Sequence, residues 1–477
     1  AAGAEYADLR IQRLVSEVIV LRDGSLETSL VDREAGLAVR VIVDGAWGFA
    51  SHAELAPDVA AVTARRAVEV ARSLGKLNAE RVVLAEEPVY SDAQWVSRYE
   101  IDPFDIPATG KIGVLDDYSQ RLLSADGVDH VSASYRGVKE QTFFANTLGS
   151  SVTQQRVRVQ PVLEAVTVDA AIGNFESMRT LSPPTARGWE AVVDDLVWDW
   201  SHELSQIPSL LEEKDKAPTV DPGSLDLVID PSNLWLTIHE SIGHATEYDR
   251  AIGYEAAYAG TSFATPDKLG NLQYGSPVMN VTADRTVDFG LATIGYDDDG
   301  VAAQTWHLVR DGIFVGYQLD RGFAWRLGLP RSNGCAYADS PHHVPIQRMA
   351  NVSLQPGAED LSIDDLIARV ENGLYIVGDK SWSIDMQRYN FQFTGQRFFR
   401  IANGRLAGQV CDVAYQSTTT DFWGSMEAVG GASTWRLGGA FNCGKGQPGQ
   451  VAPVSHGCPS ALFRGVRVLN TLTEGGR

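Results

Sequence analysis

The sequence has few cysteines, an excess of acidic over basic residues, and no long apolar run. Four cysteines in 477 residues are too few for a disulfide framework, so we expect reduced thiols and a cytoplasmic protein. With 40 basic and 61 acidic residues the formal charge is −21, which argues against nucleic acid and anionic membranes as main partners. No stretch of about 18 residues is apolar and uncharged, so we expect no transmembrane helix. The opening residues, AAGAEYADLR, also lack the features of a signal peptide.

What remains is the composition of a globular protein with more than one domain. Hydrophobic residues make up 44% and charged residues 21%, which is ordinary for a folded chain, and the length exceeds that of a single core. The segment LEEKDKAPTVDPGS at 211–224 is charged and then rich in proline and glycine, as linkers often are. We therefore predict an α+β fold, with a mixed α/β N-terminal domain over 1–220 and a mainly β C-terminal domain over 221–477.

Turn and helix signals divide both halves into elements. Asp-Gly or Asn-Gly pairs predict hairpins because the tight turns need positive φ, and they occur at 23–24, 44–45, 311–312 and 403–404. Apolar spacing and capping residues predict helices over 57–75, 109–124, 192–204 and 362–373, and a further helix capped by Ser232 or Asn233.

The segment LTIHESIGHATEYDR at 236–250 falls on that last helix and carries two of only nine histidines. His239 and His244 are five residues apart, whereas the zinc-peptidase pattern His-Glu-x-x-His spaces them by four. On a regular helix, five residues separate two side chains by roughly 140°. Either a π-bulge or unwinding near Gly243 brings the histidines together and leaves Glu240 as general base, or Glu240 and His244 are themselves ligands on one helix face. A helix that carries two histidines without a metal is the third alternative.

Other polar residues give weaker signals. The adjacent His342 and His343 point opposite ways in an extended segment, so at most one of them faces a site. The run YDDDG at 296–300 lacks the alternate spacing of a calcium loop and predicts an acidic turn near the cleft. Cys335 and Cys411 are expected to be buried small hydrophobes.

HESIGHATEYD resembles the signature of the TldD/PmbA family of metallopeptidases, on its TldD-like, catalytically competent side. GLAVRVIVDGAWGFAS and IDPFDIP resemble the family's N-terminal hairpin and mid-chain landmark. YDDDG, VRDGIFVGYQLDR, RMANVSLQPG and NGLYIVGD follow in the expected order, and NCGKGQPGQVAPVSHGCP resembles its C-terminal cysteine segment. The resemblance therefore covers nearly the whole chain.

The resemblance implies a zinc peptidase. His239, His244 and the thiolate of Cys443 would bind one zinc ion per catalytic subunit, and Glu240 would accept a proton from the attacking water. Two imidazoles and a thiolate leave one zinc position open, as a catalytic site requires. The family also implies pairing with a homologous, inactive PmbA/TldE-like subunit, in a heterodimer whose shared cavity admits unfolded or small peptides. A homodimer is the alternative.

The chain departs from the family near its end, where SHGCP replaces a Gly-x-Gly-Gln-Pro-like run. His456 could there supply an extra ligand and Cys458 a regulatory thiol, or the change could be a loop variation. Glu247 could support a ligand or be solvated.

Two rival functions stay open. One is a metal-free cysteine hydrolase that uses Cys443 as nucleophile with His456 or His342 as base. The other is a non-catalytic scaffold subunit of a peptidase complex.

Overall fold

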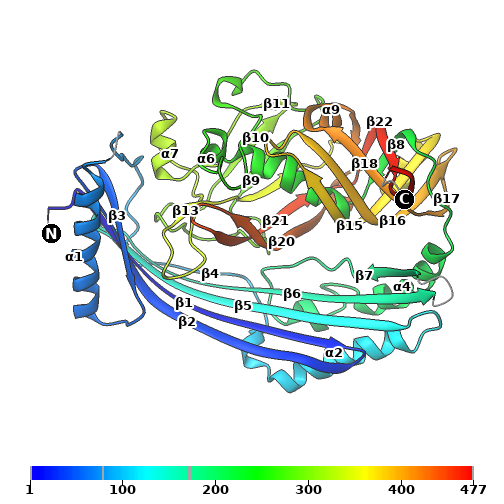
Figure 1. Cartoon of the computed structure of the whole chain (residues 1–477), viewed down its shortest axis with the longest axis horizontal. Helices are drawn as coiled ribbons and strands as arrows, with labels where there is room; N and C mark the ends of the chain where they lie inside the picture. The colour runs from blue at the N-terminus through cyan, green and yellow to red at the C-terminus, as the bar shows by residue number, and fades with distance from the viewer. Residues whose placement is uncertain (1–2, 78–79, 170–173, 475–477) are drawn as a thin grey trace.

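The computed structural model of the chain describes residues 3–77, 80–169 and 174–474. The N-terminal half forms a seven-stranded sheet in the order β3-β2-β1-β5-β6-β4, with β7 also paired to β6. Its strands are β1 Tyr6–Arg22, β2 Ser25–Val43, β3 Ala46–His52, β4 Ala93–Val96, β5 His130–Asn146, β6 Ser151–Asp169 and β7 Asn174–Arg179. Figure 1 shows the long strands running beneath the C-terminal half of the chain.

All four predicted hairpin turns are confirmed. Asp23 and Gly24 have φ of 50° and 75°, and Asp44 and Gly45 have φ of 52° and 73°. The pairs at 311–312 and 403–404 adopt the same left-handed conformation. The turn residues themselves set the backbone conformation, so these turns can be predicted without knowing what the flanking strands pack against.

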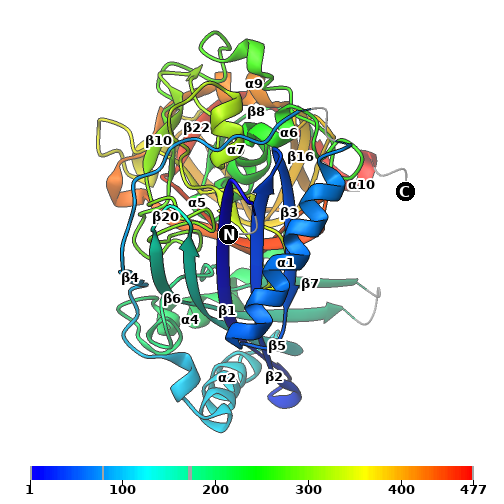
Figure 2. The same cartoon turned by 90° about the vertical axis from the view of Figure 1, so that its left-hand side faces the viewer.

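Helices cover this sheet at its end and on one face. The helices α1 Pro57–Leu74 and α2 Ala108–Leu123 lie where the sequence predicts them. Alanines of α1 pack on the valines of β2. Figure 2 shows α2 on the side of the sheet away from the C-terminal half, where it forms a core with α4 Trp200–Asp215.

The helix predicted over 192–204 is wrong as a single element. The chain forms a short α3, Glu190–Val193, and begins α4 only at Trp200. Between them the Asp194 carboxylate accepts a hydrogen bond from the Leu196 amide at 2.9 Å, and Leu196 is 96% exposed. Aspartate side chains compete here with helical hydrogen bonds. Because α4 continues to Asp215, the predicted linker at 211–224 is helical in its first part.

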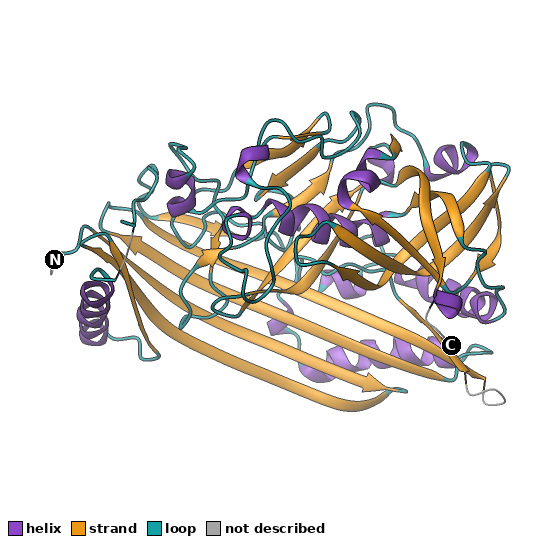
Figure 3. Cartoon of the chain, turned by 45° about the horizontal axis from the view of Figure 1, so that its top comes forward, coloured by secondary structure: helices purple, strands orange, loops and turns teal. Residues whose placement is uncertain are grey.

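The C-terminal half contains four sheets and several short helices (Figure 3), and the chain as a whole is the predicted α+β fold. The largest sheet has the order β15-β8-β22-β18-β16-β17, with β19 on β22. Its strands are β8 Gly223–Ile229, β15 Asn372–Ile384, β16 Asn390–Ala402, β17 Arg405–Val410, β18 Val413–Thr418, β19 Met426–Val429 and β22 Ala461–Asn470.

The other sheets are smaller and complete the core. They comprise β9 Val281–Asp284, β10 Thr305–Arg310, β11 Ile313–Phe314 and β14 Asn351–Leu354; β12 Ala336–Tyr337 and β13 Ile346–Gln347; and β20 Arg436–Lys445 with β21 Gln450–Cys458. The α-helices are α5 Pro231–Ile238, α6 Tyr248–Ala251, α7 Arg321–Arg326, α8 Ile363–Ala368, α9 Thr419–Gly424 and α10 Thr471–Glu474. No helix in the described ranges is both long and apolar enough to cross a bilayer.

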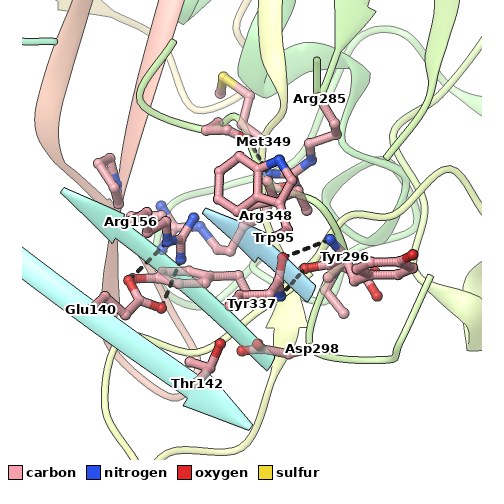
Figure 4. A pocket seen from close by; sticks show the side chains of 17 residues that line it. Trp95, Glu140, Thr142, Arg156, Arg285, Tyr296, Asp298, Tyr337, Arg348 and Met349 are labelled. Carbon is pink, nitrogen blue, oxygen red and sulfur yellow. Dashed lines mark hydrogen bonds and ion pairs between the residues drawn. The ribbon is translucent and has the colours of Figure 1, made fainter. Parts of the chain in front are cut away.

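The acidic turn at 296–300 joins the two halves. Asp298 accepts a hydrogen bond from the Arg10 guanidinium and Asp299 one from Arg40, both at 2.7 Å, and all four side chains are largely buried. The turn contacts the N-terminal sheet, and none of its residues lines the cavity around the motif histidines. Figure 4 shows a neighbouring pocket of only about 20 Å³, close to the smallest space that holds a water molecule.

Candidate metal centre

The helix that carries the histidines begins at an aspartate. The Asp230 side chain accepts a hydrogen bond from the Ser232 amide at 2.9 Å, and Pro231 occupies the first helical position. The predicted cap at Ser232 or Asn233 is therefore wrong by two or three residues. The Asn233 amide instead donates to two backbone carbonyls of the β15–β16 pair, which fixes α5 against the large sheet.

The irregular helix predicted around Gly243 is confirmed. After α5 the chain forms one π-helical turn over His239–Gly243, in which the amide of His244 donates to the carbonyl of His239, and then a 3-10 turn over His244–Thr246. The wider turn adds one residue to the helical repeat. It brings the imidazole centroids of His239 and His244 to 4.7 Å. Gly243 allows the close packing here, because a Cβ would lie 2.5 Å from the Met349 sulfur.

Cys443 reaches the same place from strand β20. Its Sγ lies 3.5 Å from Nε2 of His244, and the candidate ligand atoms of His239, His244 and Cys443 all lie within 4.8 Å of one another. All three side chains are buried. Burial alone would raise the pKa of the Cys443 thiol, but His244 and Arg348 lower it, which favours the thiolate that metals bind.

His456 fixes the orientation of His239. Its Nδ1 is 2.9 Å from the Val352 carbonyl, which can only accept, so this nitrogen carries the proton. Burial holds the pKa of His456 well below its usual value, so the ring is neutral and its Nε2 accepts. That Nε2 lies 2.7 Å from Nδ1 of His239, which must therefore donate. The Nε2 of His239 keeps its lone pair for a metal.

His244 is oriented in the same way by a carboxylate. Its Nδ1 lies 2.8 Å from Glu247 Oε2, and Lys445 donates to the other oxygen of Glu247 at 3.0 Å. Burial would raise the pKa of Glu247, but Lys445 and His244 hold it well below its usual value. The charged carboxylate accepts a hydrogen bond from Nδ1–H of His244, which leaves Nε2 facing Cys443 Sγ and the place of a metal. Carboxylate–histidine pairs of this kind commonly support metal sites.

Glu240 does not bond to either motif histidine; it forms an ion pair with Arg388, whose Nη1 lies 2.8 Å from its Oε2. Glu240 is buried, which would raise its pKa, but His239, His244 and Arg388 lower it. The carboxylate is therefore ionised and able to accept a proton. It lines the same cavity as the three candidate ligands.

The cavity beside this cluster has a volume of about 510 Å³ and is lined by both halves of the chain. The segment Arg179–Pro184, at the end of β7 and beyond it, contributes one wall. The other walls come from α5, from the β15–β16 hairpin with Trp382, and from Gly438–Gly444 of β20. A peptide segment could enter a space of this size.

The donor set fits zinc. Two imidazoles present Nε2 and a thiol with a lowered pKa presents Sγ, and borderline-soft Zn²⁺ prefers nitrogen and sulfur donors of this kind. Three protein ligands beside a cavity leave room for a further ligand, which is the arrangement of catalytic rather than structural zinc sites.

Several residues named from the sequence lie elsewhere. His343 pairs with Asp339 at 2.6 Å, and His342 lies near the N-terminal sheet, 3.4 Å from Ser51. Cys458 is buried with its pKa raised by burial, and its sulfur lies near the Pro231 carbonyl. Cys335 is buried as expected, whereas Cys411 is partly exposed.

Comparisons with known proteins identify the family. Residues 7–71, 101–222 and 222–470 match domain 1, the central domain and the C-terminal domain of the PmbA/TldA metallopeptidases. The chain is 30% identical over 467 residues to a metalloprotease of Methanothermobacter thermautotrophicus, covering 98% of this chain and 96% of that one. It is 22% identical over 471 residues to a zinc metalloprotease TldD homolog of Saccharolobus solfataricus, covering 98% and 97%. The chain belongs to the PmbA/TldD family of metallopeptidases.

Solved structures share the fold. A Thermotoga maritima protein, solved as a candidate modulator of DNA gyrase, superposes with a TM-score of 0.76 at 15% identity, over 97% of this chain and 96% of that one. TldE of Thermococcus kodakarensis gives a TM-score of 0.71 at 16% identity, over 98% and 97%. At these identities the likeness concerns the fold alone.

Sequence reasoning missed two cations that bond to the carboxylates beside the cluster in this structure. Arg388 belongs to no recognisable motif, and it reaches Glu240 because the hairpin between β15 and β16 lies beside the site. Lys445 is a buried cation that bonds to Glu247. Its one sequence signal is its place two residues after Cys443 in a β-strand, where alternate side chains share a face.

Proposed function

We propose that this chain is a zinc-dependent peptidase of the TldD type. His239, His244 and Cys443 hold the ion, and Glu240 is the general base. The observation that carries the proposal is the gathering of three buried nitrogen and sulfur donors within 4.8 Å, on the wall of a cavity that Glu240 also lines. The names of relatives, metalloprotease and zinc metalloprotease TldD homolog, support the same reaction.

The protein's own residues divide the work. His456 and Glu247 orient the two imidazoles, and Arg388 holds the Glu240 carboxylate in the cavity. The bound ion would supply a Lewis acid that polarises a carbonyl and acidifies water. Glu240 accepts a proton at its free oxygen and can return it to the leaving amine, as a general base and acid does.

The test combines metal analysis with one substitution. Purified protein should contain about one zinc per chain and should lose hydrolysis of a peptide library on treatment with a chelator. Glu240→Gln should keep the zinc and lose at least ~100-fold in rate, the scale of a lost general base. Full hydrolysis by the zinc-loaded variant would remove Glu240 from this role.

A cysteine hydrolase is the second candidate, because Cys443 Sγ and His244 Nε2 lie 3.5 Å apart. The base would then be His244 and not His456 or His342, the bases expected from the sequence, because His456 contacts His239 and His342 contacts Ser51. Activity that survives removal of zinc and is lost on alkylation would favour this candidate. A chain with neither activity would be the scaffold subunit of a peptidase complex.

We further propose that the enzyme works in the cytoplasm on unfolded or small peptides, paired with a homologous PmbA/TldE-like subunit that encloses the cavity. A domain boundary at 220/221 separates the sheet from the part that carries the ligands. Copurification from native cells followed by mass analysis distinguishes a heterodimer from a homodimer. Mapping the products from a peptide library then gives the cleavage specificity.

A further inference from the structure

Arg388 lies in the tight turn between β15 and β16 with a φ of 62°. This left-handed conformation is costly for a residue with a long side chain and is favoured by glycine. Non-glycine residues in such conformations gather at active sites and ligand clamps, where the surrounding structure holds them. The position therefore raises the question of what the arginine does there.

Hydrogen bonds hold the backbone of this turn on both sides. The Arg388 amide donates to the Asp385 carbonyl at 3.1 Å, and the Asp385 carboxylate accepts from the Tyr389 amide at 2.9 Å. The neighbouring segment also joins in, because the Thr261 amide donates to the Met386 carbonyl at 2.8 Å. The turn is thus rigid, and Arg388 leaves it in a defined direction.

The side chain of Arg388 points into the cavity beside the metal cluster. It is 14% exposed, and Nη1 donates to Glu240 at 2.8 Å. A guanidinium carries five N–H donors. Among the described residues, Nε is buried without a partner, and Glu240 is the one hydrogen-bond acceptor recorded for the group. The N–H groups that are neither buried nor bonded to Glu240 can therefore serve a ligand that enters the cavity.

The chemistry of such a ligand follows from the donors. A planar guanidinium binds carboxylate and carbonyl oxygens with parallel N–H groups, which an ammonium does not do. A peptide in this cavity offers both kinds of oxygen. Glu240 takes up Nη1 of the guanidinium, and the exposed part of the group lines the cavity that the peptide would fill.

We propose that Arg388 is a substrate-binding residue that donates to a main-chain oxygen of the peptide next to the bond that is cut. The inference rests on the proposed peptidase function. The oxygen belongs either to a free C-terminal carboxylate or to an internal carbonyl. The first source makes the enzyme trim C-terminal ends, and the second allows it to cut within the chain.

Three variants separate binding from folding. Arg388→Gly removes the side chain and leaves a residue that suits the φ of 62°. Arg388→Lys keeps the charge and loses the fork of N–H groups. Asn403→Gly is the matched control, because Asn403 also has a positive φ, 50°, in the β16–β17 turn and does not line the cavity. Melting temperature and zinc content are measured for each, so that loss of fold or of metal is recognised.

The first measurement is hydrolysis of matched N-acetylated peptides that end in a carboxylate or in an amide. Arg388→Gly should raise KM or lower kcat/KM by about tenfold or more, the scale of a hydrogen bond to a charged group, with Arg388→Lys in between and Asn403→Gly unchanged. A loss confined to the carboxylate peptides identifies the terminal carboxylate. An equal loss on both, with weaker binding of both compounds in the second measurement below, identifies a carbonyl, whereas an equal loss with unchanged binding shows only that Arg388 positions Glu240 and would overturn the proposal. Unchanged kinetics in a folded, zinc-loaded Arg388→Gly would overturn the proposal.

The second measurement needs no hydrolysis and so survives failure of the proposed function. Titration calorimetry compares the binding of N-acetyl-dialanine and its C-terminal amide to the wild type and to the variants. The proposal predicts weaker binding of at least one of the two to Arg388→Gly. Equal affinity of both proteins for both compounds would refute it, whether or not the chain is a peptidase.

Discussion

The Nδ1 atom of His239 lies 2.7 Å from the Nε2 atom of His456, although 217 residues separate the two in sequence. The Val352 carbonyl fixes the other nitrogen of His456. This chain of bonds decides which nitrogen of His239 is left for a metal. Both ring nitrogens of His456 are therefore taken up by hydrogen bonds, and under the proposed function His456 positions the ligand His239 instead of binding the metal itself.

Replacing His456 should therefore weaken zinc binding. His456→Leu removes the acceptor for the Nδ1 proton of His239 and should lower zinc affinity by ~10–100-fold, as loss of such supporting bonds does. His456→Gln offers an oxygen at a similar reach and should keep most of the affinity. Competition with a chromophoric chelator measures both. Equal affinities of the wild type and His456→Leu would show that the bond does not position the ligand.

Lys445 should be essential for stability because it neutralises buried carboxylates. Its Nζ donates to Glu247 at 3.0 Å and to Asp249 at 2.9 Å. Lys445→Met removes the cation that the two carboxylates share and should cost about 3–5 kcal/mol in the free energy of unfolding, although Glu247 keeps His244 and Arg250 beside it. Lys216→Met removes a lysine from an exposed ion pair with Glu212 and is the control, expected to unfold like the wild type in urea. Similar losses in both variants would contradict this account.

The protein should lose part of its free energy of unfolding at acid pH because Glu140 becomes protonated. Burial would raise the pKa of this carboxyl, but Arg156 and Arg158 lower it to about 2 from an ordinary 4.5. Because the folded-state pKa is depressed, the stabilisation is present above the unfolded pKa and is lost as pH falls toward about 2. Its size is on the order of 3 kcal/mol.

The comparison of wild type with Glu140→Gln isolates this effect. The variant should be less stable at neutral pH, and the difference in unfolding free energy should shrink as the pH is lowered below about 4.5. Chemical denaturation across the acid range measures the difference. A gap that stays constant with pH would mean that the pKa of Glu140 is the same in the folded and the unfolded protein.

The parts of the fold that sequence predicts are those governed by local chemistry. The turn at 23–24 follows from residues that tolerate positive φ, and the helix α1 follows from Pro57 at its start and its alanine-rich sequence. The prediction over 192–204 failed because Val192, Leu196 and Trp200 share a helical spacing by coincidence. The helix α3 ends at Asp194, whose carboxylate bonds to the Leu196 amide, and Asp199 caps the start of a new helix, α4.

In the site, too, features set by neighbouring residues could be predicted and features set by distant segments could not. The π-turn could be expected from the five-residue spacing of His239 and His244, because only an irregular helix lets them meet. Cys443 is about 200 residues away and was reached through family resemblance rather than spacing. Arg388 and the role of His456 depend on which strands pair, which no local pattern contains.

The most direct test of the metal centre is X-ray absorption spectroscopy at the zinc edge on purified protein. The account predicts two nitrogen scatterers at about 2.0–2.1 Å and one sulfur scatterer at about 2.3 Å, the usual zinc–ligand distances. The sulfur signal should disappear in Cys443→Ser while the nitrogen signal remains. A zinc shell without sulfur in the wild type, or one unchanged in Cys443→Ser, would contradict the assignment of His239, His244 and Cys443.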